Sequence, residues 1–157
     1  MSRKALLTAS MFIIAGGLTA TIGNGTAAAA PAQACAVSTV IEITHFAFNP
    51  PAIPPGGSST ASLTALNCTG QPQTTGETWF GRFVRPSGGI PSGCPVIDPI
   101  TYTTVFPPHG TVSASVTYTV PPSCTATQLI VTADITGKNG ILLAQGTAVL
   151  EIVTAAG

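Results

Sequence analysis

Alternation of apolar and polar side chains is the dominant pattern of the chain beyond residue 34. In the clearest case, from residue 111 to residue 120, every second residue is apolar and the residues between are threonine or serine. Because successive side chains of a strand point to opposite faces, this segment predicts an antiparallel strand with one buried and one wetted face. No segment shows the spacing of an amphipathic helix. The expected buried face consists of Val112, Ala114, Val116, Tyr118 and Val120.

The same alternation predicts six further strands, which are separated by turns rich in proline and glycine. Asn139-Gly140 can adopt the positive φ angles of a tight hairpin. On the last strand we expect Leu142 and Ala144 to face inward, and on the first strand we expect His45 to share the apolar face. The seven expected strands lie near residues 37–48, 58–67, 78–85, 98–106, 111–120, 127–136 and 141–154.

Seven short strands with this turn spacing resemble an immunoglobulin-like antiparallel β-sandwich. Trp79, on the third expected strand, stands where that fold often keeps a buried tryptophan. The cysteine pair that joins the second and sixth strands of antibody domains is missing, because the sixth strand has no cysteine. The resemblance therefore concerns the all-β architecture of residues 35–157, which we expect to form one domain, and it points to no specific family.

Residues 1–34 have the three parts of a secretory signal peptide. Arg3 and Lys4 are followed by an uncharged apolar run from residue 5 to residue 22, and Ala32-Gln33-Ala34 forms a small-residue cleavage site. We therefore expect the mature chain to begin at Cys35 and to be secreted. An N-terminal cysteine is also where a bacterial lipoprotein carries its lipid, so a lipid anchor at Cys35 is the alternative.

Charge is sparse in the remaining 123 residues. Three basic and five acidic residues give a net charge of −2 with neutral histidines, whereas charged residues make up about a quarter of an average domain. The sequence therefore lacks the basic face that binds nucleic acid or anionic lipid. No apolar run after residue 34 is long enough to cross a bilayer.

The four cysteines predict two disulfides in a secreted domain. In an up-down arrangement the first strand begins, and the second ends, at the same end of the sandwich, where Cys35 and Cys68 lie. The third and fifth strands both end at the opposite end, where Cys94 and Cys124 follow them. Strand direction thus predicts the pairs Cys35–Cys68 and Cys94–Cys124. No cysteine lies near a histidine or in a Cys-x-x-Cys motif, so we expect no metal.

The sequence contains no recognisable catalytic motif and no cofactor-binding motif. His45 and His109 are the two histidines, and no Gly-x-Ser-x-Gly elbow is present. The segment from Phe46 to Pro50 looks faintly like the start of a cupredoxin, but a blue-copper site needs a later histidine, and usually a methionine, that residues 110–157 do not supply. We therefore expect no enzyme activity, no cofactor and no metal site.

One expected strand concentrates residues that are common at binding surfaces. Trp79, Phe80, Arg82 and Arg85 combine aromatic and basic side chains, which are enriched at interface hot spots. Alternation directs half of the aromatic residues into the core, so packing competes with binding here. The sequence accordingly predicts a non-catalytic extracellular or cell-envelope module, binding or structural in role, whose partner is another protein or a cell-wall polysaccharide.

A proline- and glycine-rich stretch from residue 85 to residue 99 gives a second functional hypothesis. It contains Cys94-Pro95-Val96-Ile97-Asp98-Pro99, which is similar to the reactive-site segment of subtilisin-inhibitor-like proteins, where a Cys-Pro-x-x-Tyr-Asp-Pro segment is held by a cysteine about thirty residues on. Cys124 stands at that distance. The match is one residue short, the family's helical segment is absent, and a hairpin follows Cys124. The resemblance implies a secreted protease inhibitor as the alternative function.

Overall fold

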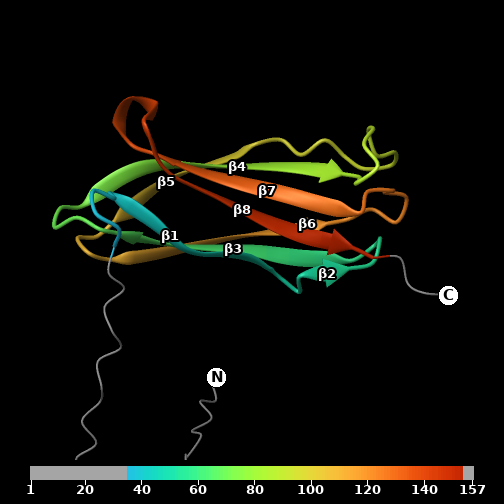
Figure 1. Cartoon of the computed structure of the whole chain (residues 1–157), viewed down its shortest axis with the longest axis horizontal. Helices are drawn as coiled ribbons and strands as arrows, with labels where there is room; N and C mark the ends of the chain where they lie inside the picture. Colours follow the sequence, from blue (N-terminus) through green and yellow to red (C-terminus); the bar gives the residue numbers. More distant parts are fainter. Residues whose placement is uncertain (1–34, 154–157) are drawn as a thin grey trace, which may run out of the picture. The chain divides into compact units, whose positions relative to one another are not determined.

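The computed structural model describes residues 35–153, so the expected signal peptide lies outside the described residues. This part of the chain folds as two packed sheets (Figure 1). The smaller sheet has the strand order β1-β3-β6, and the larger has the order β2-β8-β7-β4-β5. The elements are β1 (Ile41–Asn49), β2 (Ala52–Ile53), β3 (Ser58–Asn67), β4 (Gln73–Val84), β5 (Ile100–Phe106), β6 (Thr111–Thr119), β7 (Gln128–Thr136), the 3-10 turn η1 (Lys138–Gly140) and β8 (Leu142–Ile152).

The all-β sandwich is confirmed, and its core is the layer between the two sheets (Figure 1). Every pairing between neighbouring strands is antiparallel except that of β2 with β8, which is parallel. The expected inward residues of β3 and β7 are fully buried, which confirms the alternation that predicts those strands. They are Ala61, Leu63, Ala65, Leu129, Val131, Ala133 and Ile135.

The expectation that His45 faces the core is wrong. The pairing of β1 with β3 shifts by one residue between Ile43 and His45, which is a β-bulge. The extra residue turns the rest of the strand over, so His45 is exposed while Phe46 and Phe48 turn toward the core. A period-two pattern cannot show an inserted residue, because the apolar residues on each side of it still alternate.

The last strand shows a second irregularity. A register shift between Ile135 and Thr136 leaves Leu142 exposed, contrary to the expectation that it faces inward. Further along β8, Gly146 lies on the inner face. A side chain added there would meet Ile43 and Phe46 of β1 at 3.1–3.2 Å. A glycine at this position lets β1 and β8 pack closely and close one side of the sandwich.

The strand boundaries differ from expectation mainly in the first half of the chain. β4 begins at Gln73, five residues earlier than expected, and the two-residue β2 is an additional strand. β3 has the expected boundaries. The hairpin before β8 has the expected turn chemistry, since Asn139 and Gly140 have φ angles of 63° and 73°.

Two disulfides staple the sandwich, and their pairing is the one that strand direction predicts. Cys35 bonds to Cys68 with Cα atoms 5.8 Å apart, and Cys94 bonds to Cys124 with Cα atoms 4.4 Å apart. The first pair lies at the end of β3 and the second just beyond the end of β6. Because β3 and β6 are antiparallel, the two staples lie at opposite ends of the sandwich. This disulfide and a lipid thioether would use the same Cys35 sulfur.

Tyr118 carries a buried hydroxyl that has no hydrogen-bond partner within residues 35–153. Burial, together with the neighbouring Tyr102, raises the pKa of Tyr118 from 10.0 to about 12. The folded state therefore holds this proton more tightly than the unfolded state does. Stability is unaffected by this group below pH 10 and falls as the pH rises from 10 toward 12.

Replacing Tyr118 with phenylalanine should therefore preserve stability at pH 7 and reduce its loss in alkali. The hydroxyl makes no bond that the substitution would break, and removing an unsatisfied polar group is neutral or stabilising by about 1 kcal/mol. Urea denaturation at pH 7, 10 and 11.5 provides the measurement. A Tyr118→Phe variant that is markedly less stable at pH 7 would show that the hydroxyl has a bonding partner in solution.

Candidate functional site

Three of the four candidate binding residues lie on β4, on two different faces of the larger sheet, and Arg85 follows the end of that strand. Trp79 points into the core and is 0% exposed. It therefore packs between the sheets, and its side chain is not available to contact a partner. Phe80 and Arg82 point to the outer face and are exposed. Trp79 and Phe80 therefore cannot belong to one binding surface, although they are adjacent in the chain.

Arg85 has a structural role. Its Nε donates a hydrogen bond to the Thr125 carbonyl at 2.9 Å, and its Nη2 donates to the Thr125 hydroxyl. Thr125 also accepts from the Ser92 backbone N–H at 3.0 Å. Arg85 thus fastens the start of the long loop to the segment that follows β6 through two hydrogen bonds to Thr125.

Phe80 and Arg82 belong to a larger apolar patch on the outer face of the sheet. Arg82 of β4 pairs with Ile130 of β7, and Ile130 pairs with Val149 of β8, so the three side chains form one row across three strands. Phe80 lies in the next outward-facing row and is 43% exposed, and Val149 is 42% exposed. We call these four residues, Phe80, Arg82, Ile130 and Val149, the Phe80 patch. Single exposed apolar residues are common, but a contiguous group marks a candidate interface.

Polar pairs border the Phe80 patch on the same face. Gln128 donates to the Glu151 carboxylate at 2.8 Å, and Gln145 donates to Asp134 at 2.8 Å. These carboxylates belong to different pairs and have amide partners, so they offer no acid and base couple. The arrangement of an apolar centre with a polar surround is that of a recognition surface.

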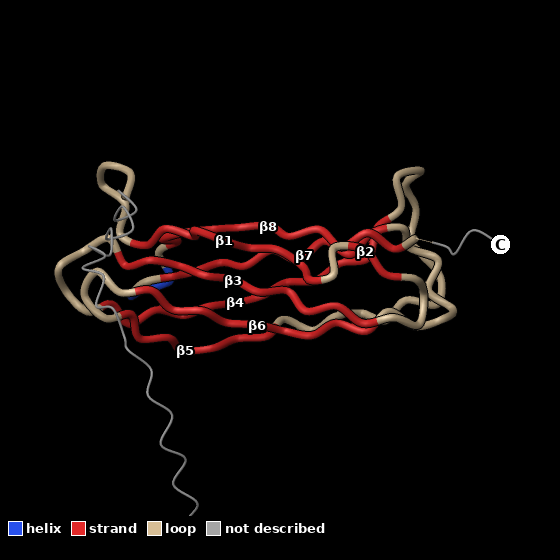
Figure 2. Tube along the Cα trace, turned by 90° about the horizontal axis from the view of Figure 1, so that it is seen from below, coloured by secondary structure: helices blue, strands red, loops and turns tan. Residues whose placement is uncertain are grey.

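The long loop closes an open side of the sandwich. β5 pairs with β4 only as far as Trp79, and beyond it the loop runs back along the rest of the sandwich (Figures 1 and 2). Ile97 packs over Gly81, where an added side chain would come within 2.8 Å of it. Val96 is 91% exposed, and the neighbouring Cys94 is tied to Cys124. The loop thus closes the open side of the sandwich through Ile97, while Val96 stays exposed beside the disulfide.

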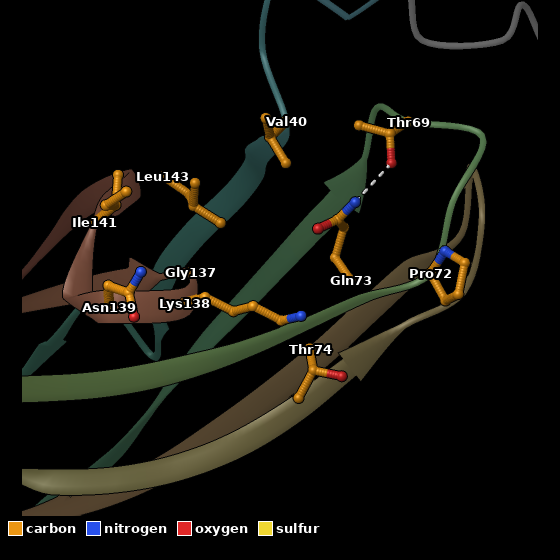
Figure 3. Close-up of a pocket in the computed structure, with 10 residues that line it drawn as sticks. All are labelled: Val40, Thr69, Pro72, Gln73, Thr74, Gly137, Lys138, Asn139, Ile141 and Leu143. Atoms are coloured by element: carbon orange, nitrogen blue, oxygen red, sulfur yellow. Dashed lines mark hydrogen bonds between the residues drawn. The ribbon is translucent and has the colours of Figure 1, made fainter.

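A pocket of about 530 Å³ lies at the end of the sandwich where β4 and β8 begin (Figure 3). The Lys138 side chain extends from η1 toward Gln73 and Thr74, and Gln73 donates a hydrogen bond to the Thr69 hydroxyl at 3.1 Å. The remaining wall is mostly apolar and includes Val40 and Leu143. The lining holds one ammonium group and no carboxylate, so it contains no acid–base pair for catalysis.

One group of potential metal ligands occurs within residues 35–153. Cys35, Glu42 and Cys68 place their ligand atoms within 4.8 Å of one another. Both sulfurs are bonded to each other as a disulfide, so neither is a thiolate that could bind a metal ion. His45 and His109 are both exposed, on β1 and in the turn before β6.

Among residues 35–153, no helix has the length and apolar character needed to span a bilayer.

No protein-family model matches the chain, and no curated protein is similar to it in sequence. Solved structures do share its fold at low sequence identity. The chain resembles part of the Pseudomonas fluorescens alkylpurine DNA glycosylase AlkC, bound to DNA containing an abasic site analogue, with 15% identity and a TM-score of 0.53. That match covers 74% of this chain and 31% of the glycosylase chain.

Two further structures align less closely. The sporulation control protein Spo0M of Bacillus subtilis matches 75% of this chain and 50% of its own, with 14% identity and a TM-score of 0.47. The PapD-like domain 7 of human CEP192 matches 92% of this chain and 99% of its own, with 15% identity and a TM-score of 0.42. The chain spans about a third of the glycosylase it resembles. The likeness to the glycosylase concerns the fold alone. The strand pairing itself shows an antiparallel, immunoglobulin-like β-sandwich, and two disulfides staple it.

Proposed function

We propose that this chain is a secreted, non-catalytic binding module that recognises another protein through the Phe80 patch. The observation that supports this proposal is the outward-facing row of Arg82, Ile130 and Val149 beside Phe80, in which Ile130 is half-buried and the other residues are exposed. Aromatic and arginine side chains are the residues most enriched at the energetic centres of protein interfaces. The sheet beneath the patch supports it, since β7 is paired with β4 on one side and with β8 on the other along the whole patch.

An extracellular location agrees with the covalent structure. Both disulfides persist only in an oxidising compartment, and the first 34 residues have the composition of a secretory leader. The surface is covered by threonine and serine hydroxyls instead of charges, so the Phe80 patch is one of the few sites with distinctive chemistry.

The composition of the patch favours a protein partner over a polysaccharide. Sugar hydroxyls require hydrogen-bond donors and acceptors close to the aromatic ring. Ile130 and Val149 supply none, and the Thr132 and Thr147 hydroxyls in the row of Phe80 are hydrogen-bonded to each other. The nearby Gln128 and Glu151 are hydrogen-bonded to each other. Apolar side chains with one arginine match the centre of a protein interface better than a carbohydrate platform.

Replacing Phe80 with serine should weaken binding to the partner about tenfold or more, because hot-spot aromatics contribute about 2 kcal/mol or more. Arg82→Ala should weaken it in the same assay. The measurement is binding of the purified protein to envelope fractions of the producing cells, with and without prior protease or polysaccharide-hydrolase treatment. Thermal melts should change little, since Phe80 is substantially exposed.

Thr103→Ala is the matched control, because Thr103 lies on the outer face of the same sheet, on β5, away from the Phe80 patch. Its binding should equal that of the original protein. Loss of binding after protease treatment identifies a protein partner, whereas loss after hydrolase treatment identifies a wall polysaccharide and contradicts the proposal. Undiminished binding by both patch variants would also contradict it.

A further inference from the structure

The strand β6 has a sequence that reads the same in both directions. From Thr111 to Thr117 it is Thr-Val-Ser-Ala-Ser-Val-Thr, with Ala114 at its centre. When a strand pairs antiparallel with a second copy of itself about a twofold axis, each residue faces its mirror position in the sequence. About Ala114, every residue of this segment would therefore face a residue of its own type.

β6 is the last strand of the smaller sheet and has a free edge (Figure 2). Backbone hydrogen bonds just beyond its two ends fix which of its groups point to β3. The Asn67 N–H donates to the Gly110 carbonyl, and the Val120 N–H donates to the Gly57 carbonyl. Because the direction of these groups alternates along a strand, the backbone groups of even-numbered residues bond to β3 and those of odd-numbered residues point outward. The outward set is Thr111, Ser113, Ser115 and Thr117.

Nothing in β6 blocks the addition of another strand. Its pairing with β3 is continuous from Thr111 to Thr119 without a bulge, and the strand contains no charge and no proline. Edge strands are usually protected by such features. Two other edges of this sandwich are protected, since β1 has a bulge beside His45 and β2 is only two residues long.

The core is also less complete beneath β6 than beneath β3. Val112, Ala114 and Val116 face the interior but are only partly buried, whereas the β3 residues opposite them are fully buried. A strand added at the β6 edge would cover the open flank of these side chains. The apolar face of β6 therefore provides a hydrophobic contribution to association in addition to backbone hydrogen bonds.

We propose that two copies of this chain associate by antiparallel pairing of β6 about a twofold axis at Ala114, joining the two smaller sheets into one sheet of six strands. Ser113 then bonds through its backbone to Ser115 of the second copy, and Thr111 to Thr117 of the second copy. Ala114 faces its own counterpart in a pair without backbone hydrogen bonds. The interface is isologous, as a closed dimer requires.

Hydroxyl pairs already present in the sheet support this geometry. Thr60 bonds to Thr117 and Thr64 to Ser113, each at 2.9 Å between hydroxyl oxygens, on the outer face of β3 and β6. The proposed pairing extends the same hydroxyl array into the second copy, with serine facing serine and threonine facing threonine. Cross-strand pairs of this kind contribute favourably to sheet association.

A second copy fits this edge better than an unrelated peptide, because only self-pairing makes use of the palindrome. β5 is also an uncharged strand at a sheet edge, but its sequence, Ile-Thr-Tyr-Thr-Thr-Val-Phe, has no such symmetry. The absence of charge on β6 means that no like charges meet across the twofold axis. This inference is independent of the Phe80 patch, which lies on the other sheet.

Sedimentation equilibrium of the disulfide-intact protein should give twice the mass of one chain. Ser115→Pro should weaken association about tenfold or more, because it removes an outward N–H and places a ring at the interface. The same N–H makes no bond to β3, so the melting temperature of the monomer should change little. Ser115→Ala keeps the N–H and should remain dimeric. A protein that is monomeric up to the millimolar range overturns the proposal.

Cysteine cross-linking tests the register and does not depend on the folding of the proline variant. Residues that face each other without backbone hydrogen bonds have Cα atoms about 4.5 Å apart, which is within disulfide range. Ala114→Cys should therefore form a disulfide-linked dimer on mild oxidation. Val112→Cys alone should not, but it should cross-link to Val116→Cys when the two variants are mixed. Equal cross-linking of all three variants with themselves would overturn the proposed register.

Discussion

Replacing Trp79 with alanine is expected to lower the free energy of unfolding by about 5 kcal/mol, which is comparable to the whole stability of many small domains. Removing a buried tryptophan costs about 3–5 kcal/mol for the lost contacts and the cavity. The indole is completely buried, and its ring lies edge-on to Phe46 with centroids 5.0 Å apart. We therefore expect the Trp79→Ala variant to be largely unfolded at 37 °C.

Part of this effect comes from a buried polar group. The Trp79 Nε1–H donates to Oε1 of Glu77, whose side chain is also buried, and the Thr104 hydroxyl donates to Oε2 at 3.3 Å. A buried carboxylate that loses a hydrogen-bond donor costs about 1–3 kcal/mol or more. The indole therefore fills the core and also satisfies an acidic side chain between the sheets.

A double-mutant cycle separates the two contributions. Trp79→Phe removes the hydrogen bond and some volume, and the same substitution in a Glu77→Leu background removes the volume and an N–H that no longer has this partner. In urea denaturation, Trp79→Phe should lower the free energy of unfolding by about 1–3 kcal/mol more in the original protein than in the Glu77→Leu background. Equal costs would show that the hydrogen bond contributes nothing. Phe80→Ala is the control for loss of an adjacent ring and should cost far less, since Phe80 is exposed.

The alternation of the sequence was sufficient to predict the sandwich and most of its strands. β3, β6 and β7 alternate without interruption, and the expected inward residues are fully buried on β3 and β7 but mostly half-buried on β6. The prediction failed where the backbone inserts a residue. The bulges at β1 and between β7 and β8 depend on pairing between strands, which a single strand's pattern does not contain.

The candidate site could be predicted only in part. Composition singled out the strand that carries Phe80 and Arg82, and alternation alone separates Phe80 from Trp79. The sequence analysis did not single out Ile130 and Val149. They alternate with the buried residues of β7 and β8, and this alternation places them on the outer face. Their proximity to Arg82 depends on the strand order β4-β7-β8, in which β7 pairs with a strand far from it in the sequence.

Removing the Cys94–Cys124 disulfide with a double alanine substitution is expected to lower the free energy of unfolding by about 2–4 kcal/mol. In the chain-entropy account, the loss depends on the length of the loop that the bond closes. The two disulfides span similar separations, 30 and 33 residues, so removal of Cys35–Cys68 should cost a similar amount. Urea denaturation of the two double variants measures both.

The local consequences of the two removals should differ, and this difference tests the role of the long loop. Cys94 holds the loop that covers Gly81, and without it the loop is held by hydrogen bonds to Ser123 and Thr125 and by the packing of Ile97. Thermolysin should then cut near Ile90 or Val96, both of which are highly exposed. The Cys35/Cys68 variant, with equal loss of stability, should resist cutting there in native conditions. Equal cutting of both variants would mean that cleavage follows global unfolding and that the disulfide does not hold the loop against the sheet.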